Sequence, residues 1–104
     1  MSETNEYLIN ISTRARDQLV THATFLAKVS VDAAYRMTDD FEVAINSLVS
    51  FPERCPWYVN EYIPKNKYRL IIFTKGYQAL FQIKDKNVFV DYVVNIRQDD
   101  DKIF

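Results

Sequence analysis

Three short segments in the C-terminal third of the chain, rich in Tyr, Phe, Val and Ile, constrain its fold more than any other feature. They are Tyr68 to Phe73, Tyr77 to Ile83 and Val88 to Ile96. β-Branched and aromatic residues favour strands, and two turn-like stretches, Thr74-Lys75-Gly76 and Lys84 to Asn87, separate the segments. The sequence therefore predicts a three-stranded antiparallel meander, which we expect to be both the scaffold and the contact surface.

The N-terminal half predicts one strand and two helices. Tyr7 to Ser12 alternates between apolar and polar residues, as a strand does. Ser12 or Thr13 is expected to cap a helix that runs to about Lys28. A second cap at Ser30 precedes a longer helix, whose apolar stripe comprises Ala34, Met37, Phe41, Ile45 and Leu48. Pro52 stops this helix, and we expect no regular structure between Phe51 and Pro56.

The order strand, helix, helix and three strands predicts the fold class. Neither helix can bury its apolar stripe except against the other helix or one face of the sheet. The sequence therefore predicts an α+β two-layer sandwich with an N-terminal strand, a two-helix hairpin and a three-stranded antiparallel meander. At 104 residues, we expect a single domain over residues 1–104.

Charge and hydropathy argue against a non-specific nucleic-acid binder and against a membrane protein. Thirteen Lys and Arg against 14 Asp and Glu give a formal net charge of −1, so no overall positive field holds a phosphate backbone. No apolar run approaches the ~20 residues of a membrane helix, and we expect no membrane partner. The single cysteine, Cys55, and the lack of an export signal lead us to expect a cytoplasmic protein.

The residues that catalytic motifs require are scarce. The only histidine, His22, falls in the middle of the first predicted helix, and one His with one Cys makes a zinc site or a nucleophilic triad a poor expectation. Gly76 is the only glycine, whereas phosphate-binding loops need several. The carboxylates of the pair Asp39-Asp40 and of the run Asp99 to Asp101 suit solvated positions. We therefore expect no cofactor and no metal.

A mixed cationic and aromatic set remains around the meander. It comprises Lys65, Lys67, Arg69, Lys75 and Arg97, with Trp57, Tyr58, Tyr62, Tyr68, Tyr77 and Tyr92 among them. Such a set suits phosphates and stacked bases, or a protein partner, because Arg and Tyr are enriched at interface hot spots. From composition alone, a solvated basic rim around partly packed aromatics explains the set equally well.

Six stretches, taken in order, carry a resemblance that covers nearly the whole chain. They are Tyr7 to Ser12 with Ala15 to Leu19; Phe41, Ala44-Ile45 and Leu48 before Phe51 to Pro56; Lys67-Tyr68-Arg69; Tyr77 to Asp85; Val88 to Val94; and Arg97-Gln98-Asp99. Together they resemble the RelE/ParE superfamily, also called the plasmid stabilisation protein family. Its members are the toxins of bacterial type II toxin–antitoxin modules.

The resemblance implies a small growth-inhibiting toxin that a cognate antitoxin neutralises. Members similar to RelE cut mRNA on the ribosome, where basic residues of the sheet stabilise the charge of the transition state. Members similar to ParE inhibit DNA gyrase. We expect the antitoxin as the partner, in a homodimer or a heterotetramer.

The match to the ribonuclease pattern is incomplete. Arg69 and Arg97 occupy basic positions of that pattern, and they are the catalytic candidates only if the protein is a ribonuclease. Four other positions depart from it: Ile71 replaces a second lysine, Gln78 an arginine, Asn95 a histidine and Phe104 a C-terminal tyrosine. Because one lost electrostatic donor costs roughly 10²- to 10³-fold in rate, these departures favour the ParE-like side.

The sequence therefore predicts a ParE-like toxin that acts by binding gyrase. A RelE-like ribosome-dependent mRNA endoribonuclease is the first alternative, and a non-toxic member that only binds antitoxin is the second. The expected binding surface comprises Lys67, Tyr68, Arg69, Lys75, Tyr77, Gln78, Asn95 and Arg97. Strand register is needed to decide whether Arg69, Gln78 and Arg97 share one face of the sheet.

Overall fold

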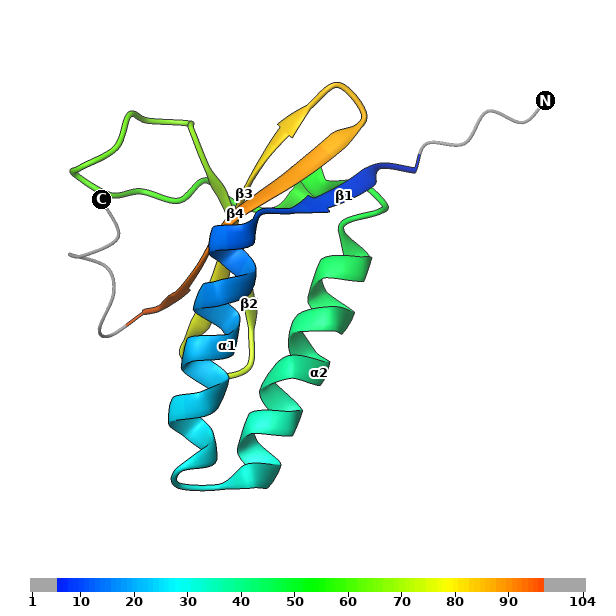
Figure 1. Ribbon diagram of the computed structural model, residues 1–104. Helices are drawn as coiled ribbons and strands as arrows, with labels where there is room; N and C mark the ends of the chain where they lie inside the picture. Colours follow the sequence, from blue (N-terminus) through cyan, green and yellow to red (C-terminus); the bar gives the residue numbers. More distant parts are fainter. Residues whose placement is uncertain (1–5, 97–104) are drawn as a thin grey trace.

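A four-stranded sheet carries two antiparallel helices on one face (Figure 1). The computed structural model describes residues 6–96. In chain order the elements are β1 (Leu8–Ile11), α1 (Thr13–Ala27), α2 (Val31–Ser47), a short 3-10 helix η1 (Pro52–Arg54), β2 (Arg69–Phe73), β3 (Tyr77–Lys84) and β4 (Asn87–Asn95). This is the α+β architecture that the sequence predicts, and the element ends agree to within about a residue.

The sheet has the strand order β1-β4-β3-β2. The last three strands form the predicted antiparallel meander. β1 lies parallel to β4, with Ile9 opposite Val88. The sequence predicted the first strand without a partner, because a parallel pairing over so long a separation leaves no local signal.

Both predicted serine caps are confirmed. The Ser12 hydroxyl accepts a hydrogen bond from the Ala15 amide at 3.0 Å, and the Ser30 hydroxyl accepts one from the Ala33 amide at 3.1 Å. Each bond satisfies one amide of a first helical turn that has no partner within its helix. The two caps therefore fix where the helices of the hairpin begin.

The main core lies between the helices and the sheet. The predicted apolar stripe supplies Met37, Phe41, Ile45 and, directly after α2, Leu48, which are all buried, whereas Ala34 of the same stripe is half-buried. From the sheet, alternate residues of β3 point to the same side: Tyr77, Ala79 and Phe81. Burying this shared apolar surface is the main stabilisation of the two layers.

The opposite face of the sheet is also partly covered. The connector between η1 and β2 contributes Tyr58 and Ile63, which pack with Leu80 and Val94 of the sheet. A β-bulge between Leu80 and Phe81 of β3 leaves Asp91 of β4 without a pairing partner in the register. The connector is therefore a second, irregular layer and not a solvated loop.

One expectation is corrected between the helices and the meander. We expected no regular structure from Phe51 to Pro56, but residues Pro52–Arg54 form one turn of 3-10 helix. Proline suits a first helical position because its missing amide has no partner to lose there. Phe51, at a φ of +50°, reverses the chain, and the Cys55 amide closes the turn on the Pro52 carbonyl at 3.1 Å.

Within residues 6–96, no helix has the length and apolarity that crossing a membrane requires.

Candidate functional site

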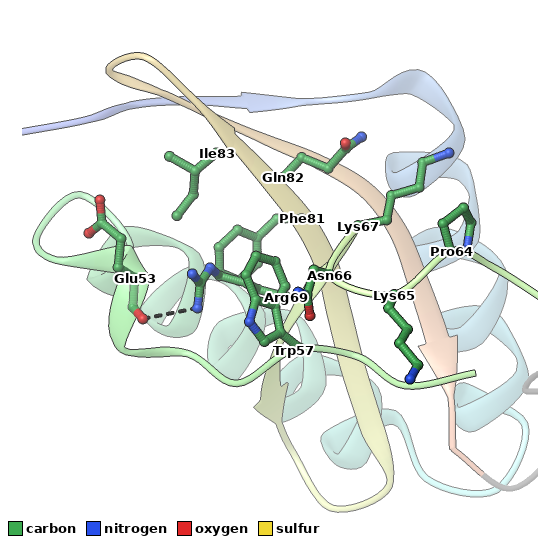
Figure 2. A pocket seen from close by; sticks show the side chains of 10 residues that line it. All are labelled: Glu53, Trp57, Pro64, Lys65, Asn66, Lys67, Arg69, Phe81, Gln82 and Ile83. Carbon is green, nitrogen blue, oxygen red and sulfur yellow. Dashed lines mark hydrogen bonds between the residues drawn. The ribbon is translucent and has the colours of Figure 1, made fainter. Parts of the chain in front are cut away.

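The connector and the meander together enclose a pocket of about 450 Å³ (Figure 2). Its walls are Glu53, Trp57, Pro64, Lys65, Asn66, Lys67, Arg69, Phe81, Gln82 and Ile83. Three of these side chains are cationic, Lys65, Lys67 and Arg69, and one is a carboxylate. The volume of this pocket falls within the range of ligand-binding sites.

Backbone pairing builds the wall that holds Trp57 and Arg69. The connector returns along the outer edge of β2, where the Tyr58 amide donates to the Tyr68 carbonyl at 2.7 Å and the Leu70 amide donates to the Pro56 carbonyl at 3.0 Å. This pairing places Trp57 directly opposite Arg69 in an antiparallel bridge. Residues in that relation have adjacent side chains, so the two meet across the edge.

Arg69 is held by three neighbours. Its guanidinium carbon lies 3.9 Å from the centre of the Trp57 ring, a cation–π contact. Its Nη1 donates to the Glu53 carbonyl at 3.0 Å and to the Cys55 carbonyl at 2.6 Å. Within residues 6–96, Nε and Nη2 of Arg69 have no hydrogen-bond acceptor. The side chain is therefore anchored through one nitrogen, and its other two nitrogens have no acceptor in the described part of the chain.

The carboxylate of Glu53 is hydrogen-bonded to a tyrosine and not to the lysines of the pocket. It accepts a hydrogen bond from the Tyr7 hydroxyl at 2.5 Å, while Figure 2 shows that the backbone carbonyl of Glu53 is the atom bonded to Arg69. The Tyr7 hydroxyl, with a smaller effect from Arg69 and Lys86, lowers the pKa of Glu53. Glu53 is therefore an anion at neutral pH, and it is a weak proton acceptor.

A second pocket, of about 470 Å³, adjoins the first along the connector. It shares four wall residues with the first: Trp57, Pro64, Lys65 and Asn66. The rest of its wall is Tyr58, Val59, Asn60, Glu61 and Ile63. Asn66 has a φ of +60°, a left-handed conformation that asparagine tolerates better than most residues. Asn66 thus lies in the wall that the apolar pocket shares with the cationic one.

A hydrogen-bonded network surrounds Asp91 at the bulge. Its carboxylate accepts from the Tyr68 hydroxyl at 3.0 Å and from the Gln82 amide nitrogen at 3.1 Å. Arg14 donates through Nε to the Asp91 carbonyl at 3.2 Å and lies 4.0 Å from the centre of the Tyr92 ring. Burial, and then the charge of Asp91, raises the pKa of Tyr68. Tyr68 is therefore a neutral hydrogen-bond donor.

The structure brings some of the predicted site residues together. Lys67 and Arg69 line the same pocket. Tyr68, between them in the chain, is buried on the opposite face of the sheet. Arg69 pairs with Phe81, a residue of the main core, whereas Gln78 pairs with Ile72 and Val94 and is only 5% exposed. Directly opposed residues share a face, so Arg69 and Gln78 lie on different faces.

The remaining predicted residues lie at the far end of the meander. Lys75 is exposed in the turn between β2 and β3. Tyr77 is buried, with its ring centre 5.2 Å from that of His22, and it pairs with Asn95. These residues do not line the cationic pocket. Arg97 and Phe104, like the run Asp99 to Asp101, lie outside the described residues.

Sequence reasoning did not single out six residues that line the cationic pocket: Glu53, Pro64, Asn66, Phe81, Gln82 and Ile83. The one local signal in the sequence is the residue type of Asn66, because asparagine adopts a positive φ more readily than most residues. The structure gives it a φ of +60°. The others belong to the site only through the return of the connector along β2, which the sequence pattern does not encode.

Polar groups outside the pocket have structural partners. The Asp40 carboxylate accepts from the Thr74 hydroxyl at 2.6 Å and so ties α2 to the turn between β2 and β3. Burial raises the pKa of the Cys55 thiol, which disfavours the reactive thiolate. Among residues 6–96 there is no group of three His, Cys, Asp or Glu side chains that could hold a metal ion.

The fold and the site together define the class: an α+β protein with a helical hairpin on a mixed sheet and a cationic, aromatic pocket beside the edge strand. No family model matches the chain, and no curated protein matches it. A solved chain from "Chromosomal ParDE TA system from P. aeruginosa" superimposes with a TM-score of 0.68 at 10% identity, over 89% of this chain and 99% of that chain. At this identity the likeness establishes a shared fold.

Proposed function

We propose that this chain is the toxin of a type II toxin–antitoxin module, of the ParE-like kind. Its target is DNA gyrase, which it inhibits by binding, and a cognate antitoxin neutralises it. The observation that carries the proposal is the fold shared with a chain of a ParDE system over 99% of that chain's length. The ordered sequence resemblance to the RelE/ParE superfamily points to the same class independently.

The chemistry of the pocket favours binding over catalysis. Cleavage of RNA by attack of a 2′-hydroxyl needs a group that accepts its proton. The carboxylate in the pocket, Glu53, has a lowered pKa and accepts from Tyr7. Gln78, at the position where the ribonuclease pattern has arginine, is buried on the face opposite Arg69. These features suit a surface that recognises a protein without making or breaking a bond.

One observation favours a second candidate function. Lys65, Lys67 and Arg69 all line a single pocket, and a ribonuclease would also need basic residues there. A ribosome-dependent mRNA endoribonuclease, with Arg69 and Arg97 as electrostatic catalysts, is therefore retained as the alternative. Either activity places the protein in the cytoplasm, with its antitoxin as the first partner and a homodimer or a heterotetramer as the assembly.

Inducible expression in bacteria that lack the antitoxin tests the proposal. We expect growth arrest with filamentation and induction of the DNA damage response, because blocked gyrase stops replication. Incorporation of labelled thymidine should fall before incorporation of labelled amino acids. Intact DNA replication during the arrest would reject the gyrase target.

Primer extension on translated messages from the same cultures tests the alternative. Cuts at the ribosomal A site would favour the endoribonuclease over the gyrase inhibitor, and their absence would dismiss it. Harmless overexpression would instead identify a non-toxic member that only binds antitoxin. A small adjacent reading frame with a DNA-binding N-terminal half would supply the antitoxin for a neutralisation experiment.

A further inference from the structure

The two pockets beside the connector are parts of one surface. Trp57, Pro64, Lys65 and Asn66 belong to the walls of both. We infer that the surface is a two-part binding site for a protein segment that carries a carboxylate side chain and, close to it, a bulky apolar side chain. The inference rests on the proposed function in one respect only: the partner is a protein.

The cationic half is equipped to bind a carboxylate. Arg69 is held by two backbone carbonyls through Nη1, which leaves Nε and Nη2 as a pair of adjacent donors. This pair matches the spacing of the two oxygens of a carboxylate, and the rigid anchoring of the side chain reduces the entropy lost on binding. Lys65 and Lys67 are exposed on the same wall and add attraction at longer range.

The acidic group of this half does not compete with such a ligand. The carboxylate of Glu53 accepts from Tyr7, whose ring in turn lies 4.6 Å from the Lys86 ammonium. Glu53 therefore bonds Arg69 through its backbone carbonyl, while its carboxylate is bonded to Tyr7 and attracts Arg69 only as a smaller effect. The three cations of the pocket outnumber the one carboxylate, so the half carries a net positive charge.

The apolar half is equipped to bind a large side chain. Tyr58, Ile63 and Pro64 line it, and Val59 at its rim is 88% exposed. The Trp57 ring, 41% exposed, forms the boundary between the halves. Tryptophan and arginine are the residues most enriched at the energetic centres of protein interfaces, and here they are stacked on each other.

The distribution of charge favours a protein over a nucleic acid. Each nucleotide of a strand brings a phosphate, so a strand crossing both halves needs cations in both. The apolar half contains Lys65, which it shares with the other pocket, together with the carboxylate of Glu61. A peptide with one acidic and one apolar residue matches this pattern, because it places a charge in one half only.

The tryptophan provides the measurement. Trp57 is the single tryptophan of the chain and lies in the shared wall, so its fluorescence reports on ligands in either half. The purified full chain would be titrated with synthetic peptides that carry Asp and Leu at varied spacing in a Gly-Ser background. Matched peptides have Asn in place of Asp or Ala in place of Leu, and an oligouridylate is the nucleic-acid probe.

We expect a saturable change of Trp57 emission with the Asp and Leu peptides and much weaker binding of both matched sets. The double variant Lys65→Glu/Lys67→Glu should weaken binding by roughly tenfold, because two exposed attractions become repulsions. Val59→Ser should weaken it through the apolar half. Lys28→Glu/Arg36→Glu is the charge-matched control, since both residues are exposed on the helical hairpin and line neither pocket.

Three outcomes would overturn the inference. They are equal binding of the Asn peptides, no binding of any peptide, and preferential binding of oligouridylate that the lysine variant abolishes; the last would identify a nucleic-acid site. Growth arrest by a chain that binds no peptide would leave the proposed function standing without this site. Peptide binding by a chain that causes no arrest would support this site and reject the proposed function.

Discussion

At the scale of single residues, Arg69 connects the connector to the edge strand. It stacks on Trp57 and bonds two carbonyls of the preceding turn. Arg69→Lys keeps the charge but loses the planar group that makes these contacts together. We expect the free energy of unfolding to fall by about 1–2 kcal/mol, measured by urea denaturation followed by circular dichroism.

The same variant should alter the fluorescence of the folded protein. Without the guanidinium stacked on it, the Trp57 ring becomes more exposed to water, and its emission should move to longer wavelength. Lys75→Ala, in an exposed turn, is the control, and its effect should stay within about 0.5 kcal/mol. Unchanged stability and unchanged emission in Arg69→Lys would contradict the assigned role.

A second prediction at this scale concerns Tyr7 and Glu53. The hydrogen bond between them lowers the pKa of Glu53 below its ordinary value of 4.5 and raises the pKa of Tyr7 above its ordinary value of 10.0. Tyr7→Phe removes the donor, so the pKa of Glu53 should rise. A carboxyl-detected NMR titration measures this change, and an identical Glu53 titration in the variant would refute the coupling.

Linkage gives the sign of the effect on stability. A lowered pKa of Glu53 in the folded state stabilises the protein above the ordinary carboxyl pKa, and this stabilisation is lost as the pH falls through the lowered value. The raised pKa of Tyr7 stabilises below pH 10, and this contribution is lost as the pH rises through the raised value. The stability difference between wild type and Tyr7→Phe should therefore be constant near neutrality and shrink at both extremes.

At the scale of elements, the buried stripe of α2 predicts a sharp contrast between its faces. Met37 is fully buried between α2 and the sheet, whereas Val43, on the same helix, is 71% exposed. Met37→Ala should lower the free energy of unfolding by about 2–5 kcal/mol, and Val43→Ala by less than about 0.5 kcal/mol. Similar effects of both substitutions in chemical denaturation would mean that α2 packs differently.

The elements also show which parts of the fold a sequence can predict. The Ser12 and Ser30 caps, the stripe of α2 and the three meander strands depend on local pattern, and all were predicted. The parallel pairing of β1 with β4 and the bulge at Asp91 depend on contacts between distant segments. Local pattern carries no information about them, so they became visible only in the structure.

The candidate site, too, could be predicted from the sequence only in part. The sequence singled out Lys65, Lys67, Arg69 and Trp57 as chemical types, but it did not predict that Trp57 would stack on Arg69, because that contact requires the connector to pair with β2. Nor did it decide whether Arg69 and Gln78 share a face. That answer depends on the register across the turn between β2 and β3, which pairs Gln78 with Ile72.

At the scale of the whole molecule, the proposed activity depends on the irregular connector and on the two pockets beside it. The helices cover one face of the sheet, the connector covers part of the other, and the cationic and apolar pockets lie along the connector beside β2. The scaffold is shared with a chain of a ParDE system at 10% identity. We propose that such a scaffold keeps its shape through its core while the connector determines which protein it binds.

Supercoiling by purified gyrase tests the central claim most directly. Relaxed plasmid, gyrase and ATP would be incubated with increasing amounts of the purified full chain, with relaxation by topoisomerase I as the control reaction. We predict that supercoiling falls in proportion to the added protein, that the control reaction is unaffected, and that a ribosome-dependent mRNA cleavage assay with the same sample stays negative. Gyrase that supercoils at its full rate in excess protein, together with cleaved mRNA, would contradict the account.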